Sequence, residues 1–291
     1  MKSKNNSNTQ TICSYPRFIS FKIPDDWKYS SLGKITDLIR GISYKTSDIN
    51  RDGKGSFFVN LNCFKEEGGF IDKGIIFFNG ITKKNPVNSD DLLIAITEVT
   101  LKGRIIGYPL IIPSPYNSNP IFNSMDTAYL KLKTSDFDRK FIYYFLCTEL
   151  CHNSMFSFSA GSTVLHLNIK SAKKIIVPCP PIHEQEKISD LLSKIDELLE
   201  NIANTIENFK KLKIGMVQKL LIKGIRKTKL IEKEWLFKKS IKIPIDWEIY
   251  QISDIAKKEK NAFSMGPFGS DIKKENFVDE GVPVIRGNNL T

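Results

Sequence analysis

The stretch from Pro180 to Ile188 reads Pro-Pro-Ile-His-Glu-Gln-Glu-Lys-Ile and marks a change in the character of the chain. Proline suits the first turn of a helix, and acidic side chains interact favourably with a helix N-terminus. We therefore predict a helix over residues 182–224, ending where Gly224 favours a stop.

Apolar residues follow this start at alternating spacings of four and three. They are Ile188, Leu192, Ile195, Leu199, Ile202, Ile206, Phe209, Met216 and Leu220. Only Lys213 interrupts the heptad pattern, which is typical of a coiled coil. About 33 residues at ~1.5 Å per residue give a coiled coil roughly 50 Å long.

Charge is divided along this helix. The acidic half carries Glu184, Glu186, Asp190, Asp196, Glu197, Glu200 and Glu207 against Lys187 and Lys194. The basic half carries Lys210, Lys211, Lys213, Lys219, Lys223, Arg226, Lys227 and Lys229 without an acid. Two copies laid antiparallel would match opposite charges, so the pattern predicts an antiparallel partner helix.

Upstream of the helix, residues 21–181 alternate short apolar runs with Gly and Pro, which predicts a mixed α/β (α+β) domain. The expected strands cover 57–61, 75–78, 92–97, 104–112, 127–132 and 174–177. A helix is expected over about 136–154, capped by Ser135 or Asp136. The fold class is thus an α+β domain followed by a long helix.

A short segment of the chain repeats. Lys22–Trp27 (Lys-Ile-Pro-Asp-Asp-Trp) returns as Lys242–Trp247 (Lys-Ile-Pro-Ile-Asp-Trp), 220 residues later and with five identities in six positions. A globular part plus a helix therefore forms the repeating unit. This gives a polar arm at 1–20, a domain at 21–181, the helix at 182–224, a linker at 225–240 and the start of a second domain at 241–291.

Bulk composition points to a polyanion. The formal net charge is +11 over 291 residues, which favours nucleic acid or an anionic membrane surface. No apolar run approaches the length of a membrane span and no signal peptide is evident, so we expect a cytoplasmic protein. The five cysteines are expected to be buried small hydrophobes rather than disulfides or metal ligands.

Catalytic patterns are missing from the sequence. There is no phosphate-binding Gly-x-x-x-x-Gly-Lys loop and no Gly-rich cofactor loop. His183 lacks zinc-site spacing, and Asp25 and Asp26 are adjacent rather than on separate strands. We predict neither a catalytic centre nor a metal site in this chain.

With these residues in hand, the chain resembles the specificity subunit of type I restriction-modification systems. The resemblance rests on Lys-Ile-Pro-x-x-Trp followed by Leu32–Ile35, on Gly161–Ile169, and on the strand–Pro-Pro–x-x-Glu-Gln junction at 175–188. Gly266–Ser270 and Val282–Leu290 resemble the opening of another target-recognition domain. Against that family, the chain reads as truncated early in a second such domain, by natural truncation, a frameshift or an incomplete coding segment.

The resemblance implies a non-catalytic subunit that reads double-stranded DNA. In the family, two target-recognition domains each read half of a split site, and paired antiparallel helices set the spacing. Methyltransferase subunits supply S-adenosylmethionine chemistry, and a restriction (motor) subunit uses ATP and Mg. No cofactor is expected in this chain. Because the chain carries one such domain and only the start of a second, we expect an antiparallel homodimer through residues 188–220 and a palindromic split site.

Candidate DNA contacts lie in loops, where Lys and Arg can reach phosphates. They are Arg40, Tyr44, Lys45, Arg51, Lys54, Lys83, Lys84, Lys102 and Arg104. Three alternatives remain open at this point: an inactive remnant of such a subunit, an enzyme with its own recognition domain, and a coiled-coil protein with no restriction role, with or without DNA binding.

Overall fold

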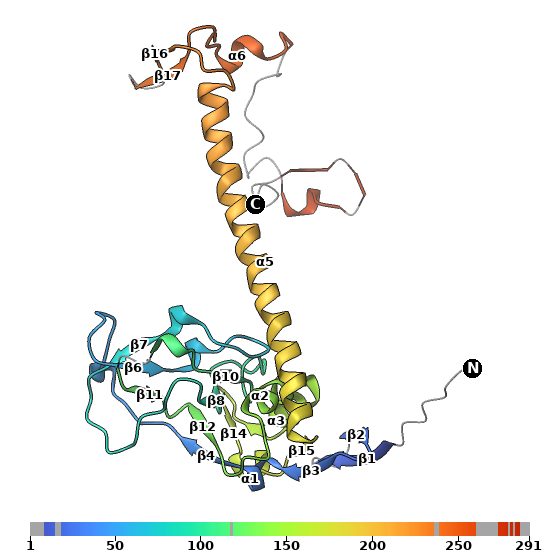
Figure 1. Cartoon of the computed structure of the whole chain (residues 1–291). Coiled ribbons are helices and arrows are strands. Elements are labelled where there is room, and N and C mark those ends of the chain that lie inside the picture. Colours follow the sequence, from blue (N-terminus) through green and yellow to red (C-terminus); the bar gives the residue numbers. More distant parts are fainter. Residues whose placement is uncertain are drawn as a thin grey trace. The chain divides into compact units, whose positions relative to one another are not determined.

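A computed structural model describes residues 9–14, 19–116, 119–235, 239–259, 273–278, 280–281 and 283–285 (Figure 1). The chain divides into two compact units, Met1–Ala203 and Asn204–Thr291. The expected motif at 266–270, most of that at 282–290 and much of the N-terminal arm lie outside the described residues.

Two sheets and a layer of helices build the first unit. The larger sheet has the order β10-β8-β12-β4, that is Pro109–Ile111, Leu92–Ala95, Thr127–Leu132 and Thr36–Arg40. The second has the order β11-β6-β7-β5, that is Ile121–Asn123, Ser56–Val59, Ile76–Phe78 and Ile49–Asn50. Three smaller strands form β13-β14-β9, that is Ser159–Ala160, Leu165–Leu167 and Thr97–Glu98.

Strand β8 is buried on both faces. Leu92 and Ile94 join a core with helices α2 (Arg139–Cys147) and α3 (Glu149–Ser157). Leu93 and Ala95 join a second core that includes Val59 of β6. Because successive side chains of a strand point to opposite faces, a continuous apolar run is what a strand between two layers requires.

The remaining elements of this unit are short. Helix α1 (Leu32–Ile35) and helix α4 (Ile169–Ala172) flank the two-stranded sheet of β3 (Lys28–Ser31) and β15 (Ile176–Cys179). The 3-10 turns are η1 (Thr46–Asp48), η2 (Leu61–Cys63), η3 (Asp72–Gly74) and η4 (Ser114–Tyr116), with η6 (Lys274–Asn276) in the second unit. The β3–β15 pair joins the start of the domain to its end.

Helix α5 (Ile182–Lys223) begins at the predicted residue and ends one residue before the predicted Gly224. Its first turns are fixed to the preceding α+β domain by Gln185, which is fully buried. The Gln185 amide donates to the carbonyls of Pro180 and Asp136 at 2.8 and 2.9 Å and accepts from the Asp138 amide at 3.0 Å. Ser189 adds a hydrogen bond of 2.6 Å to the Asp138 carboxylate. The Glu-Gln motif therefore contributes a buried anchor between helix and domain.

The expected helix over 136–154 is wrong as a single element. It is two helices, because Thr148 has extended backbone angles (φ −66°, ψ 143°) and caps α3 by accepting from the Cys151 amide. The cap of α2 is Asp138, which accepts from the Phe141 amide at 2.8 Å, and not Ser135 or Asp136. The expected strand over 104–112 shrinks to Pro109–Ile111.

Strands form in both the predicted N-terminal arm and the predicted linker. In the first unit, β1 (Thr9–Ser14) pairs antiparallel with β2 (Ile19–Pro24). In the second unit, β16 (Leu230–Glu234) pairs antiparallel with β17 (Ser240–Pro244). Described residues of both the predicted arm and the predicted linker therefore lie in paired strands.

The sequence repeat is also a structural repeat. Each hairpin ends at the proline of Lys-Ile-Pro, and the tryptophan amide donates to that proline carbonyl, at 3.1 Å for Trp27 and 3.0 Å for Trp247. A one-turn helix follows each, α1 at Leu32–Ile35 and α6 at Ile252–Ile255, again 220 residues apart. The second copy thus repeats the hairpin, the turn and the short helix of the first.

Candidate nucleic-acid interface

Two of the predicted DNA-contacting loops lie side by side. Strand β5 pairs with β7 through Ile49 opposite Phe78, and the Asn79 amide donates to the Asp48 carbonyl at 2.9 Å. These contacts place the segment after Gly80 next to the loop from Gly41 to Gly55. Six of the nine candidates lie in these two loops, which we call the basic loop pair, and Arg40 ends the strand just before the first loop. The seven residues are Arg40, Tyr44, Lys45, Arg51, Lys54, Lys83 and Lys84.

Lys84 ties the two loops together. Its ammonium donates to the carbonyl of Arg40 at 2.8 Å and to that of Gly41 at 2.6 Å. Since Arg40 ends β4, the segment after Gly80 is fixed to the edge of the larger sheet. Lys84 therefore positions the loops, and its charge offsets the negative end of two carbonyl dipoles.

The other members of the loop pair are exposed and locally ordered. Arg51 and Lys54 sit in the β5–β6 turn, where Asn50 accepts from the Asp52 amide and donates to the Lys54 carbonyl. The Tyr44 ring packs edge-on against Phe58, with 4.8 Å between ring centroids. Burial, and then the nearby Asp126, raise the pKa of the Tyr44 phenol, so its hydroxyl stays protonated and able to donate.

A cleft of about 420 Å³ opens beside Arg40 and Lys84. Further polar lining comes from Lys131, Asn85, Asn88, Asn123 and Tyr129, and from the carboxylate of Asp91. Sequence reasoning missed Lys131 and the asparagines. The sequence could have indicated Lys131, because it is a polar residue at an alternating position of the correctly predicted strand β12 (Thr127–Leu132).

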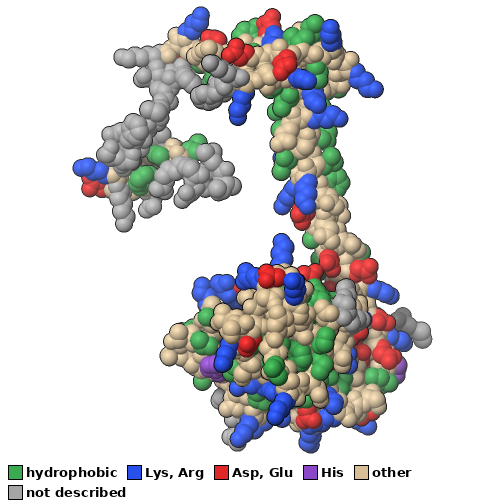
Figure 2. All heavy atoms as spheres, turned by 90° about the vertical axis from the view of Figure 1, so that its left-hand side faces the viewer, with side chains coloured by type: hydrophobic (Ala, Val, Ile, Leu, Met, Phe, Trp, Pro, Cys, Tyr) green, Lys and Arg blue, Asp and Glu red, His purple; other side chains and the backbone are tan. Residues whose placement is uncertain are grey.

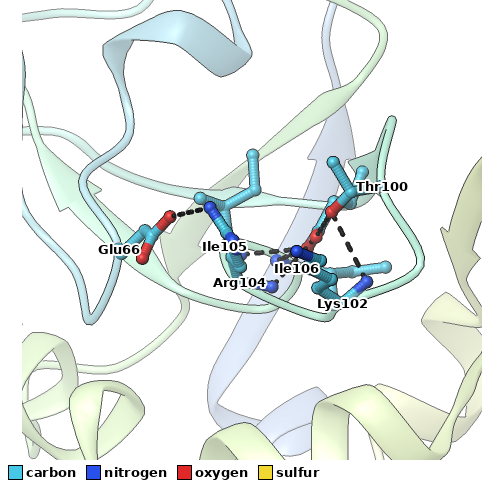
Figure 3. A network of polar contacts seen from close by, with 7 residues as sticks. Glu66, Thr100, Lys102, Arg104, Ile105 and Ile106 are labelled. Atoms are coloured by element: carbon cyan, nitrogen blue, oxygen red, sulfur yellow. Dashed lines mark hydrogen bonds and ion pairs between the residues drawn. The ribbon is translucent and has the colours of Figure 1, made fainter. Parts of the chain in front are cut away.

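Lys102 and Arg104 belong to a separate loop, drawn in Figure 3. This loop is organised by Glu98, only 2% exposed, whose carboxylate accepts from the amides of Arg104, Ile105 and Ile106 at 2.9 to 3.0 Å and from the Thr100 hydroxyl. The Arg104 guanidinium forms an exposed ion pair with Glu66 at 3.1 Å. The side chains of Val99 and Leu101 remain exposed.

The Glu98 carboxylate is held ionised. Burial is the largest single influence and opposes charge, but the hydrogen bonds from Thr100 and three backbone amides together outweigh it and lower the pKa. A carboxylate with this many donors fixes the shape of the loop. The positions of Lys102 and Arg104 are thus determined by a residue that charge patterns in the sequence do not single out.

The heptad positions of α5 form an exposed apolar stripe. Residues 194–219 are all exposed, and Figure 2 shows hydrophobic side chains on the surface of this helix. Ile195, Leu199, Ile202, Ile206, Phe209 and Met216 are 44% to 64% exposed. Ile188, in contrast, is half-buried and packs against the core of the α+β domain, so this heptad position also makes a contact within the chain.

The described residues do not form a group of three or more His, Cys, Asp or Glu that could hold a metal ion. Cys63 and Cys151 are buried, Cys147 and Cys179 are half-buried, and all four are free thiols. Burial raises the pKa of the Cys63 thiol to about 11 and that of Cys147 to about 12, so both are protonated and unreactive at neutral pH. Within the described part of the chain, no helix is long and apolar enough to cross a membrane.

Comparison with protein families gives a match over residues 24–208 to the type I restriction modification DNA specificity domain. The matched range begins at the proline of Lys-Ile-Pro and ends within α5. It therefore includes the basic loop pair and the Gln185 anchor.

Curated relatives carry the same description. The chain is 24% identical to the MjaVIII specificity subunit of Methanocaldococcus jannaschii, over 92% of this chain and 56% of the relative. It is 22% identical to the EcoKI specificity subunit of Escherichia coli K12, over 67% of this chain and 43% of the relative. A crystal structure of an S subunit from M. genitalium aligns with a TM-score of 0.46 and 22% identity, covering 76% of this chain and 47% of that chain. The chain thus spans about half the length of the relatives it matches.

Proposed function

Because the chain belongs to the type I restriction modification DNA specificity family, we propose that it reads one half of a split site on double-stranded DNA. The observation that carries this proposal is the basic loop pair, in which Lys84 holds two Lys- and Arg-bearing loops together at one edge of the domain. Cations held in fixed positions suit a duplex, because phosphate contacts supply affinity and set register.

The second half of the site comes from a second copy of the chain. The exposed stripe on α5 is apolar, and the helix carries acids in its first half and bases in its second. An antiparallel pair buries both stripes and places each acidic half against a basic half. Two identical domains related by a two-fold axis would read two inverted copies of one half-site.

The paired chains act as a scaffold for catalytic partners. Methyltransferase subunits bring S-adenosylmethionine chemistry, and a restriction subunit brings ATP- and Mg-dependent translocation and cleavage. The residues of this chain recognise DNA and hold those subunits in place, and this work is expected in the cytoplasm, where the DNA is. The Glu98 loop and the basic half of α5 provide further cations for either role.

Selection from a randomised duplex library tests the proposal. The full chain, at moderate salt, should enrich two inverted half-sites separated by a fixed gap. A coiled-coil protein without a recognition role would enrich no motif, and its residual binding would vanish as salt is raised. An inactive remnant would give the same negative result, whereas an enzyme would modify the duplex without partner subunits.

A further inference from the structure

Ile81 directly follows Gly80 in the second loop of the basic loop pair. Its relative exposure is 102%, so its side chain touches nothing else in the domain. Burying an aliphatic side chain of this size contributes to stability, and here the fold leaves that contribution unused. The neighbours along the chain are Thr82, Lys83 and Lys84, which are polar or charged, as expected for a surface loop.

The loop that carries Ile81 is held at both ends. Before it, Gly80 is pressed against Asp48 and the Phe78 ring, so closely that an added Cβ would lie 2.6 Å from that ring. After it, the Thr82 hydroxyl accepts from the Lys84 amide at 3.1 Å, and the Lys84 ammonium is fixed on Arg40 and Gly41. Ile81 is thus displayed from a braced loop, which lowers the entropy lost when it binds.

We propose that Ile81 is a specificity-determining residue that packs on the methyl group of a thymine in the major groove. This rests on the proposed DNA-reading function. The major groove is about 12 Å wide and admits two passes of polypeptide, whereas the minor groove, at about 6 Å, does not. Within the major groove, the thymine methyl is the apolar group that an aliphatic side chain can recognise. Lys83 beside it can reach the flanking phosphates.

The assignment divides the work of the loop among three side chains. Ile81 contacts the base, Lys83 contacts the backbone, and Lys84 acts as a positioning residue through its bonds to Arg40 and Gly41. Substitution of Ile81 should therefore change which DNA sequence is preferred and leave the sequence-independent affinity unchanged.

A double-mutant cycle that combines Ile81→Ala with the removal of single thymine methyl groups tests this proposal. The wild-type full chain first selects its site from a random duplex library. Each thymine of that site is then replaced singly by deoxyuridine, which removes only the methyl group, and binding is measured for wild type and for Ile81→Ala. Ile225→Ala is the matched control, because Ile225 is the same residue type, is 90% exposed and lies in the second unit.

The wild type and Ile225→Ala should lose about fourfold in affinity at one or more thymines, the value of one buried methyl group. Ile81→Ala should bind the thymine and deoxyuridine duplexes equally well, with an unchanged unfolding midpoint. Retention of the full discrimination by Ile81→Ala would overturn the assignment, as would a wild type indifferent to every thymine methyl. If the wild type selects no site, the proposed function fails, and the inference falls with it.

Discussion

The side-chain oxygen of Gln185 accepts a hydrogen bond from the backbone amide of Asp138 at 3.0 Å. This bond joins the first turn of α5 to the cap of α2, and the Gln185 amide also satisfies the carbonyls of Asp136 and Pro180. A buried side chain with all its polar atoms paired fixes the helix to the recognition domain. Any role of α5 in spacing two such domains depends on this joint.

Gln185→Ala should lower the free energy of unfolding of the recognition domain by about 2–4 kcal/mol, because the buried Pro180 carbonyl and two part-buried backbone groups lose their partners. Urea unfolding followed by tryptophan fluorescence measures this. Gln218→Ala, on an exposed part of the same helix, is the control and should change stability by less than about 0.5 kcal/mol. Equal effects of the two substitutions would mean that the joint is not stabilising.

Glu98→Gln should destabilise the chain by about 2–3 kcal/mol at pH 7, because an amide cannot accept from all four donors without presenting its own NH₂ group to them. The carboxyl pKa is lowered on folding from 4.5, so its contribution is complete above pH 4.5 and is lost as the pH falls through the lower folded value. The difference between wild type and variant in urea unfolding should therefore shrink at low pH. A difference that stays constant down to pH 3 would argue against an ionised Glu98.

Substitution by alanine should have opposite effects on stability at Gly215, which lies within α5, and at Gly224, which directly follows it. Gly224 has φ +69°, and an added Cβ would lie 3.2 Å from the Trp247 ring, so Gly224→Ala should destabilise the second unit by about 1 kcal/mol. Gly215 lies within the helix with open space around it, so Gly215→Ala should raise stability by up to about 1 kcal/mol. Thermal unfolding monitored by helical circular dichroism distinguishes them, and a shift in the same direction for both would contradict this description of the helix end.

Removal of two cations from the basic loop pair should change the salt dependence of DNA binding. For Arg51→Ala combined with Lys54→Ala, the slope of log K against log salt on a 30-bp duplex should fall in magnitude by about 2. Lys34→Ala with Lys170→Ala is the control, since these exposed lysines lie on α1 and α4, at the β3–β15 side. Identical slopes for wild type and the Arg51/Lys54 variant would place the DNA elsewhere.

Local signals explain what the sequence could predict. The start of α5 and the strand Thr127–Leu132 were placed correctly, because prolines, acids and period-two alternation act over a few residues. The break at Thr148 also had a local signal, a threonine able to cap, but the continuous apolar spacing concealed it. The strand expected over 104–112 is wrong because the amides of residues 104–106 bond to the side chain of Glu98 rather than to another strand, and Gly103 and Gly107 adopt positive φ.

The candidate site also depends on contacts between residues that are distant in the sequence. Charge and loop position indicated candidate residues, but the pairing of β5 with β7, which brings the two loops together, joins segments far apart in the sequence. Lys84 is a predicted DNA contact whose ammonium is bonded to the carbonyls of Arg40 and Gly41, and these residues lie more than 40 positions away in the sequence. Ile81 carries no charge and therefore escaped a search for basic residues.

The central claim is that two chains pair through α5, and sedimentation equilibrium of the full chain tests it most directly. The account predicts a dimer of twice 33.2 kDa at micromolar concentration, and a monomer for Leu199→Glu with Ile206→Glu, whose side chains are 59% and 50% exposed. Asn204→Glu with Asn208→Glu, which adds the same two charges away from the apolar stripe, should remain a dimer. A wild type that sediments as a 33.2 kDa monomer, with Leu199 and Ile206 tolerant of glutamate, would contradict the account.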